Sequence, residues 1–168
     1  MIRAFLPKDA AAVAVGADDI AAEISTLAKD IELVRTGSRG MFWLEPLLEV
    51  EVSGVRYGFG PLETADLAGL IKAGLFDPSK AAGIDHPKSL GPVDQISWLA
   101  RQTRLTFARC GVIDPMSLSA YEDAGGYKGL AKSAIARPPG HHRRSAEIRP
   151  PRPWRRGLPD RHQVENRA

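Results

Sequence analysis

The N-terminal part of the chain alternates between short apolar runs and longer segments with apolar residues at helical spacing. Five- or six-residue runs rich in aliphatic, β-branched and aromatic side chains predict strands at residues 2–6, 31–36, 47–52 and 55–59. The longer segments, residues 8–29 and 62–75, predict amphipathic helices. The pattern therefore predicts a small sheet covered by helices.

Turn-forming residues separate these predicted elements. Gly16 is expected to interrupt the first helical segment, and Pro61 to open the second, which ends before Asp77-Pro78. Ser53-Gly54 lies between the third and fourth strands, where a two-residue hairpin turn is expected. The resulting order, β-α-β-β-β-α, is that of a thioredoxin-like domain, an α/β fold with a mixed sheet. We expect this domain to span residues 1–76.

The remainder of the chain predicts a linker, a second segment and a tail. Residues 77–103 begin with a run rich in Pro, Gly and Lys and are expected to link two domains. In residues 104–136, the stretch 104–108 alternates like a strand. Ser117 is expected to cap a helix that ends at Gly125-Gly126, and another helix is expected from Tyr127.

Residues 111–130 carry the motif on which a family resemblance rests, GVIDPMSLSAYEDAGGYKGL. The motif resembles the entry to the flavoprotein subunit of NADH-linked dehydrogenases. That family includes the complex I FMN subunit, the diaphorase subunit of NAD-reducing hydrogenases and the beta subunit of NAD-dependent formate dehydrogenase. Together with HPKSLGP at residues 86–92 and the thioredoxin-like order, the sequence is most similar to the formate dehydrogenase beta subunit.

The loop after the second predicted strand, GSRGMFWLEP at residues 37–46, resembles a cluster-binding loop. In thioredoxin-like ferredoxins this loop carries two of the cysteines that hold a two-iron cluster. Here Ser38 and Phe42 occupy those positions, and residues 7–13, where the other pair is expected, contain no cysteine. Because iron–sulfur clusters need thiolate ligands, we expect a domain without a cluster, retained for packing or docking.

Two interpretations of this loop stay open. Arg39, Phe42 and Trp43 could form an exposed contact surface, since aromatic residues and arginine are enriched at interfaces. Alternatively, Phe42 and Trp43 could fill the core beneath the sheet.

The remaining candidate ligands give no site. Cys110 is the only cysteine, and it is expected to be a small buried side chain on the strand at residues 104–108 and its continuation. His86 is expected to be an ordinary loop residue, and His141-His142 lack further metal ligands at useful spacing. We therefore predict no catalytic, cofactor-binding or metal-binding residue in this chain.

Charge is unevenly distributed along the sequence. Residues 137–168 contain nine arginines and three acidic residues, a net charge of +6, whereas residues 1–136 carry −3. This tail also holds six of the 13 prolines and few apolar residues, which predicts disorder. Taken directly, such a tail suggests binding to nucleic acid.

A displaced reading frame gives a better account of the tail. With the frame displaced by one nucleotide, Trp154 followed by Arg155 forces a glycine, and residues 149–167 permit GLRGRGGAGFPTGIKWKTV. This resembles the glycine-rich motif with which the family cradles flavin and nicotinamide. We therefore expect an insertion or deletion of one nucleotide near residues 132–137, and regard the basic tail as artefactual rather than as a nucleic-acid site.

These observations predict a fragment of an electron-transfer subunit that is inactive as this chain. The resemblance implies formate oxidation coupled to NAD reduction, with FMN, NAD and a four-iron cluster in the intact family member and other dehydrogenase subunits as partners. No cofactor is expected here, because Pro and Arg stand where the glycines would be and the cluster cysteines are absent. The alternatives are a hydrogenase or complex I subunit fragment, or a non-enzymatic thioredoxin-like adaptor with a basic tail. The sequence shows no secretion signal and no membrane-length apolar run, so a cytoplasmic location is expected.

Removing residues 137–168 tests the interpretation of the tail. Since the tail has little apolar surface to offset an ordering cost of roughly 1–2 kcal/mol per residue, its deletion should leave the melting temperature almost unchanged. Thermal denaturation followed by circular dichroism measures this. A drop of several degrees would show that the tail packs on the folded part.

Overall fold

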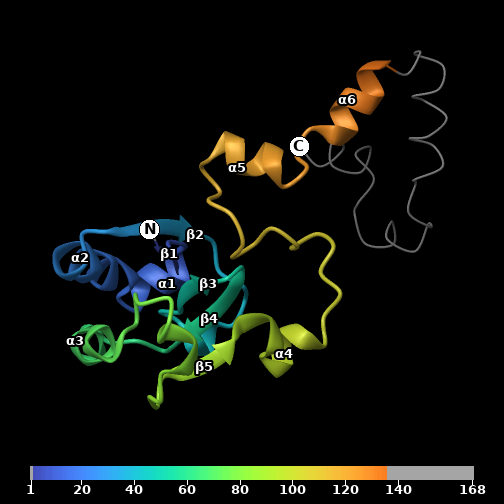
Figure 1. The fold of residues 1–168 in the computed structure, drawn as a ribbon. Helices are drawn as coiled ribbons and strands as arrows, with labels where there is room; N and C mark the ends of the chain where they lie inside the picture. The colour runs from blue at the N-terminus through green and yellow to red at the C-terminus, as the bar shows by residue number, and fades with distance from the viewer. Residues whose placement is uncertain (1, 136–168) are drawn as a thin grey trace, which may run out of the picture. The chain divides into compact units, whose positions relative to one another are not determined.

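The computed structural model describes residues 2–135, and they build a five-stranded mixed sheet in the order β2-β1-β3-β4-β5 (Figure 1). The strands are β1 (Ile2–Pro7), β2 (Ile31–Thr36), β3 (Leu48–Val52), β4 (Val55–Phe59) and β5 (Ser89–Pro92). The α-helices are α1 (Ala10–Ala14), α2 (Ala17–Leu27), α3 (Thr64–Ala73), α4 (Ser97–Ala100), α5 (Leu118–Asp123) and α6 (Lys128–Ile135). Short 3-10 helices lie at Phe42–Leu44, Ala81–Gly83 and Val93–Gln95.

The first four strands have the thioredoxin-like arrangement that the sequence predicts. β1 pairs in parallel with β2, from Ile2 opposite Ile31 to Pro7 opposite Thr36, and antiparallel with β3. β3 and β4 form the expected hairpin, whose turn residues Ser53 and Gly54 both have positive φ, 50° and 79°. Positive φ at both turn residues matches the twist of a two-residue hairpin. The predicted fold class is therefore confirmed.

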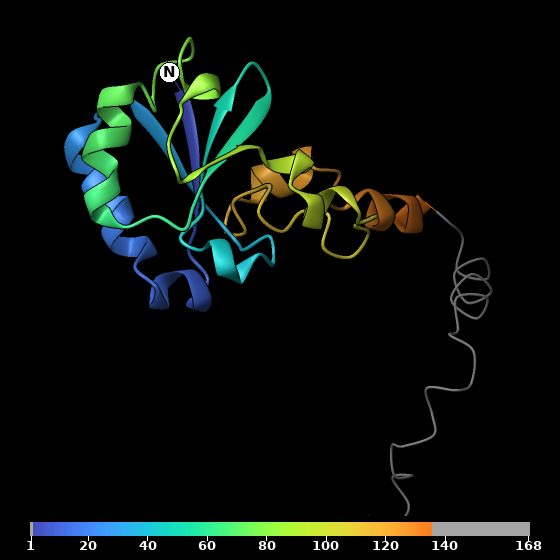
Figure 2. The same cartoon turned by 90° about the horizontal axis from the view of Figure 1, so that it is seen from below.

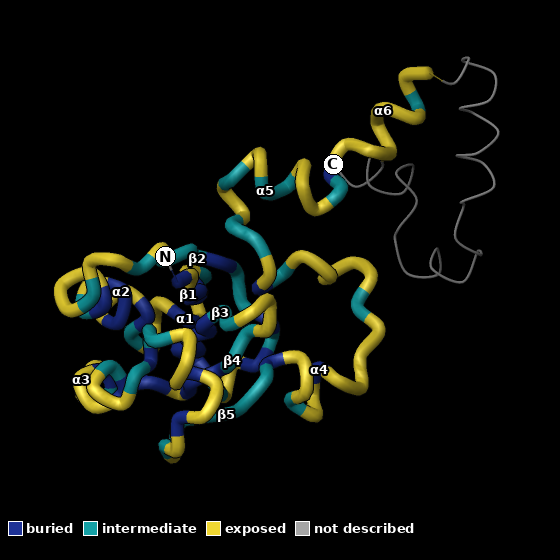
Figure 3. The backbone as a smooth tube through the Cα atoms, viewed as in Figure 1, coloured by how far each residue is buried: buried dark blue, intermediate teal, exposed yellow. Residues whose placement is uncertain are grey.

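α2 and α3 lie side by side on one face of the sheet (Figure 2). Ile20 and Ile24 of α2 and Leu67 and Leu70 of α3 are buried against alternate strand residues. Figure 3 shows buried residues in the central strands β1 and β3 and in α2 and α3, whereas β2 and β5 at the edges of the sheet are mostly intermediate. Gly16, with φ of 99°, separates α1 from α2, so the predicted break is confirmed.

The segment predicted as a linker, residues 77–103, contains parts of the folded unit. β5 extends the sheet by pairing antiparallel with β4, and Ala81 and Ile84 join the hydrophobic core. The fifth strand escaped prediction because SLGP is short and contains Pro and Gly, a composition that an edge strand tolerates. Contacts group residues Met1–Gly125 in one compact unit and begin a second at Gly126. The predicted domain boundaries themselves stay predictions.

The strand predicted at residues 104–108 is wrong. This stretch forms turns, and Leu105 and Phe107 are exposed, because no neighbouring strand is available to satisfy an extended backbone. Beyond it the expected helices are present. Ser117 caps α5, its side chain accepting a hydrogen bond from the backbone N–H of Ala120, and α6 follows Gly125-Gly126.

The tail predicted to be disordered and frameshifted, residues 137–168, and the last residue of the predicted entry segment lie outside the described residues. Within residues 2–135, no helix combines the length and the apolar composition needed to cross a membrane.

The face of the sheet opposite α2 and α3 carries a network of charges centred on Glu49. This buried carboxylate accepts hydrogen bonds from Arg39 and from Arg56, with Arg39 Nη2 at 2.9 Å and Arg56 Nη1 at 3.3 Å from Oε2. Arg56 also donates to the backbone carbonyls of Gly111 and Val112, at 2.9 and 2.7 Å, and its guanidinium lies 3.4 Å from the centre of the Phe5 ring. One strand residue therefore ties the segment after α4 to the sheet.

Gly111 is required where this segment crosses the network. Its φ is 77°, and a Cβ atom at this position would clash with Cγ of Arg39. Any side chain here would strain the backbone and displace the arginine that holds Glu49. The glycine that opens the family-like motif therefore has a structural explanation.

Glu49 and Glu51 offer a matched test on one strand. Glu49→Ala leaves two arginines without their buried carboxylate and should lower the free energy of unfolding by about 3–5 kcal/mol. Glu51 forms a more exposed ion pair with Arg3, so Glu51→Ala should cost no more than about 1 kcal/mol. Urea denaturation at neutral pH compares the two variants. Equal losses would show that the Glu49 network does not hold the segment in place.

Candidate functional site

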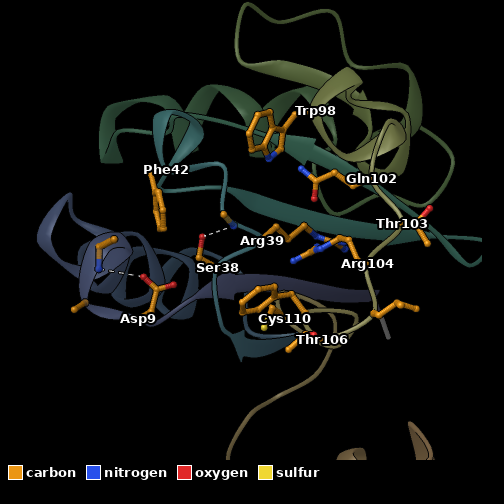
Figure 4. A pocket seen from close by; sticks show the side chains of 15 residues that line it. Asp9, Ser38, Arg39, Phe42, Trp98, Gln102, Thr103, Arg104, Thr106 and Cys110 are labelled. Atoms are coloured by element: carbon orange, nitrogen blue, oxygen red, sulfur yellow. Dashed lines mark hydrogen bonds between the residues drawn. The ribbon is translucent and has the colours of Figure 1, made fainter. Parts of the chain in front are cut away.

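A cavity of about 950 Å³ opens where the loops after β1 and β2 meet the segment after α4 (Figure 4). Its walls come from three parts of the chain that are distant in sequence. They are residues 9–11 at the start of α1, residues 38–42 in the loop after β2, and residues 98–110. The structure therefore brings together the two loops in which the resemblance places the cluster cysteines.

Asp9 fixes the loop after β1. Its Oδ1 atom accepts hydrogen bonds from the backbone N–H groups of Ala11 and Ala12, both at 3.1 Å, and so caps α1. Its Oδ2 atom is buried and has no hydrogen-bond partner among the described residues. The Asp9 carboxylate thus caps α1 with Oδ1, while Oδ2 has no hydrogen-bond donor among the described residues.

Ser38 and Glu45 close the loop after β2. The Ser38 hydroxyl donates to Glu45 Oε1 at 2.7 Å and accepts from the backbone N–H of Gly40 at 3.0 Å. Glu45 Oε2 accepts from the backbone N–H of Leu47 at 3.2 Å. Burial raises the pKa of Glu45 above its ordinary value, against the lowering effect of the bonds from Ser38 and Leu47, and the charge of Asp9 adds to the rise.

The donor set around this cavity does not fit a two-iron cluster. Ser38 stands at one predicted ligand position with its hydroxyl already bound to Glu45, and Phe42 at the other offers no donor atom. Cys110 supplies the one thiol in the lining, whereas such clusters are held by four ligands that are mostly thiolates. Among residues 2–135, no group of three or more His, Cys, Asp and Glu side chains could hold a metal ion.

The structure decides between the two interpretations of the aromatic loop. Phe42 and Trp43 are exposed, so the alternative that they fill the core beneath the sheet is wrong. Arg39, by contrast, is buried and bound to Glu49, and it also approaches Asp94 at 3.5 Å. Burial opposes the charge of Arg39, yet the hydrogen bond and the negative charge of Glu49 raise its pKa overall. Arg39 therefore supports the loop instead of presenting a contact.

Cys110 and His86 are the other candidate ligands from the sequence whose positions the structure describes. Cys110 is half-buried and lines the cavity from a turn, so its expected position as a buried strand residue is wrong. His86 lies in a loop, where its Nδ1 atom is 3.2 Å from the backbone nitrogen of Lys88, from which it accepts a hydrogen bond. This contact is consistent with the structural role that we expect for His86.

Sequence reasoning missed the wall contributed by the segment after α4. Trp98 packs edge-to-face against Trp43, with ring centroids 5.3 Å apart, and Arg104 and Phe107 line the cavity. Figure 4 shows the Trp98 and Phe42 side chains at this cavity with Arg104 across from them. No motif marks these residues, because they meet the loop after β2 through tertiary contacts such as those of Trp98 with Trp43 and of Arg56 with Gly111 and Val112.

No family model and no curated protein matches the sequence. Among solved structures, the chain is similar to the wild-type thioredoxin-like 2Fe-2S ferredoxin from Aquifex aeolicus, with 12% identity and a TM-score of 0.37 over 45% of this chain and 85% of the ferredoxin. A cysteine-to-serine variant of that ferredoxin gives 13% identity and a TM-score of 0.36 over 45% of this chain and 88% of the variant. The chemistry of the cavity therefore has to be deduced from its own residues.

The raised pKa of Glu45 predicts how stability depends on pH. A carboxyl group whose pKa is higher in the folded state stabilises the fold below its unfolded pKa, and this contribution is lost as the pH rises through the folded pKa. Glu45→Gln should therefore flatten the decline in melting temperature between acidic and neutral pH. Ser38→Ala removes a bond that favours the ionised form, so it should steepen that decline and cost about 1 kcal/mol at neutral pH. Identical pH profiles for both variants and the wild type would contradict this assignment.

Proposed function

We propose that the chain is the N-terminal part of the flavoprotein (beta) subunit of an NAD-dependent formate dehydrogenase, with a thioredoxin-like domain that docks rather than transfers electrons. The intact subunit would pass electrons from iron–sulfur clusters through FMN to NAD, which is the chemistry that these groups supply. The chain's own contribution would be to pack and to position. Its expected partners are other subunits of the same complex, in the cytoplasm.

The observation that carries this proposal is the meeting of the two loops in which the resemblance places cluster cysteines, around donors that cannot hold a cluster. Ser38 is bound to Glu45 and Asp9 caps α1, so both loops are held by hydrogen bonds. A loop that folds without iron can be retained for its surface alone. The resemblance of residues 111–130 supports the family part of the proposal. Its first glycine is, separately, required by the contact with Arg39.

Two alternatives remain candidates for this function. A fragment of a hydrogenase diaphorase or of the complex I flavoprotein subunit shares the same motif and would have the same role for this domain. A non-enzymatic thioredoxin-like adaptor is favoured by the exposed aromatic side chains of the loop after β2. Flavin binding by the repaired sequence distinguishes the first group from the adaptor.

Reconstitution tests the proposed function. The purified chain, incubated with FMN, ferrous iron and sulfide, should show no bound-flavin absorbance and no NADH oxidation, because its glycine-rich loop is replaced by Pro and Arg. A chain in which the displaced frame and its downstream sequence are restored should bind FMN stoichiometrically.

Two results would contradict these expectations. Stoichiometric flavin on the unrepaired chain would show that a site exists within this sequence. A restored chain that folds, by circular dichroism, yet binds no FMN would exclude both the family assignment and the frameshift.

A further inference from the structure

Exposed apolar side chains gather around the cavity and beside it. Their exposed fractions are high: Phe42 61%, Trp43 56%, Trp98 49%, Leu105 84% and Phe107 64%. A second cavity of about 480 Å³ shares Trp98 and Gln102 with the first, so the two adjoin. We call these five residues and the two cavities the aromatic groove. Large contiguous apolar patches on a protein surface mark interaction sites.

The charged residues that line the groove are mostly basic. Arg101 lines the smaller cavity and Arg104 the larger, and among the described residues neither forms an ion pair. Arg39 is paired with Glu49 and with Asp94. The one carboxylate in the lining, Asp9, caps α1 with Oδ1, and its Oδ2 has no hydrogen-bond partner among the described residues. An occupant that places carboxylates beside Arg101 and Arg104 would complete this charge pattern.

We propose that the aromatic groove is the docking surface for a segment of a partner protein that combines apolar side chains with Asp or Glu. Trp43 and Trp98 would receive the apolar side chains, and Arg101 and Arg104 would pair with the carboxylates. A second copy of this chain is a poorer occupant, because a symmetric dimer would set the same basic rim against itself. This inference deepens the proposed function, since it names the surface and the partner chemistry of a docking domain.

We expect the edge-to-face pair of Trp43 and Trp98 to contribute most of the binding free energy at the groove. Binding energy concentrates in aromatic and arginine side chains that become fully desolvated, while charges on the rim contribute less. Trp98→Ala should therefore weaken binding about 30-fold, corresponding to loss of one dominant contact. Replacing Arg101 and Arg104 together by Gln should weaken it by a smaller factor that shrinks further at high salt.

A peptide selection tests the groove with the full chain. The purified protein is panned against a random linear peptide library displayed on phage, and the most enriched sequence is synthesised with a fluorescein label. We expect enriched peptides to contain aromatic or aliphatic residues next to Asp or Glu. Fluorescence anisotropy then gives the dissociation constants for the wild type, for Trp98→Ala and for the double arginine variant.

Matched variants keep the test decisive. Val55→Ala, at the exposed hairpin tip, and Lys72→Gln, on α3, remove an apolar side chain and a charge outside the groove and should leave binding unchanged. Phe107→Ala replaces Trp98→Ala if circular dichroism shows that the latter is unfolded.

Four results would overturn the inference. They are no enrichment, enrichment of basic sequences, binding that is insensitive to Trp98→Ala and Phe107→Ala, or a stable dimer that Trp98→Ala dissociates. Because no flavin is involved, failure here leaves the flavin test of the family assignment intact, and failure of that test leaves the groove intact.

Discussion

A buried carboxylate with two arginines is the constraint on which much of this structure depends. Glu49 lies on the sheet face that α2 and α3 leave uncovered, and its charge is tolerable there only because Arg39 and Arg56 both donate to it. Arg39 belongs to the loop after β2, and Arg56 reaches the backbone at Gly111 and Val112. One ionic cluster therefore connects two of the three walls of the cavity to the sheet, the loop after β2 and the segment after α4. The Glu45–Ser38 bond then shapes the loop locally.

The two loops beside the cavity are each held by the chain's own side chains. The loop after β1 is held by helix capping from Asp9, and the loop after β2 by Ser38, Glu45 and Arg39. The aromatic side chains of that second loop belong to neither buried cluster. One cluster lies between the sheet and its helices, and a smaller one of Met41, Leu47, Val93 and Leu99 lies beside the loop. Phe42 and Trp43 are consequently exposed at the surface.

Local patterns predicted the parts of the fold whose stability is local. The hairpin at Ser53-Gly54, the break at Gly16 and the cap at Ser117 follow from backbone preferences of those residues, and the structure has all three. The failures concern segments that depend on distant partners. The alternation at residues 104–108 indicated a strand, but no neighbouring strand is there to pair with it. β5 lacks a strand-like composition, yet it pairs antiparallel with β4. In the same way, the sequence identified the loop at residues 37–46 but not Trp98 or Arg104, which reach the cavity through tertiary contacts alone.

The grip of Arg56 on the segment after α4 has a consequence for sequence variation. Both of its bonds end on main-chain carbonyl oxygens, which every amino acid provides. The contact therefore depends on the course of the backbone and not on the side chains along it. Gly111 is the exception, because no Cβ fits beside Arg39. Related chains should be free to diverge at the position of Val112 while this glycine, Arg39, Glu49 and Arg56 change only together.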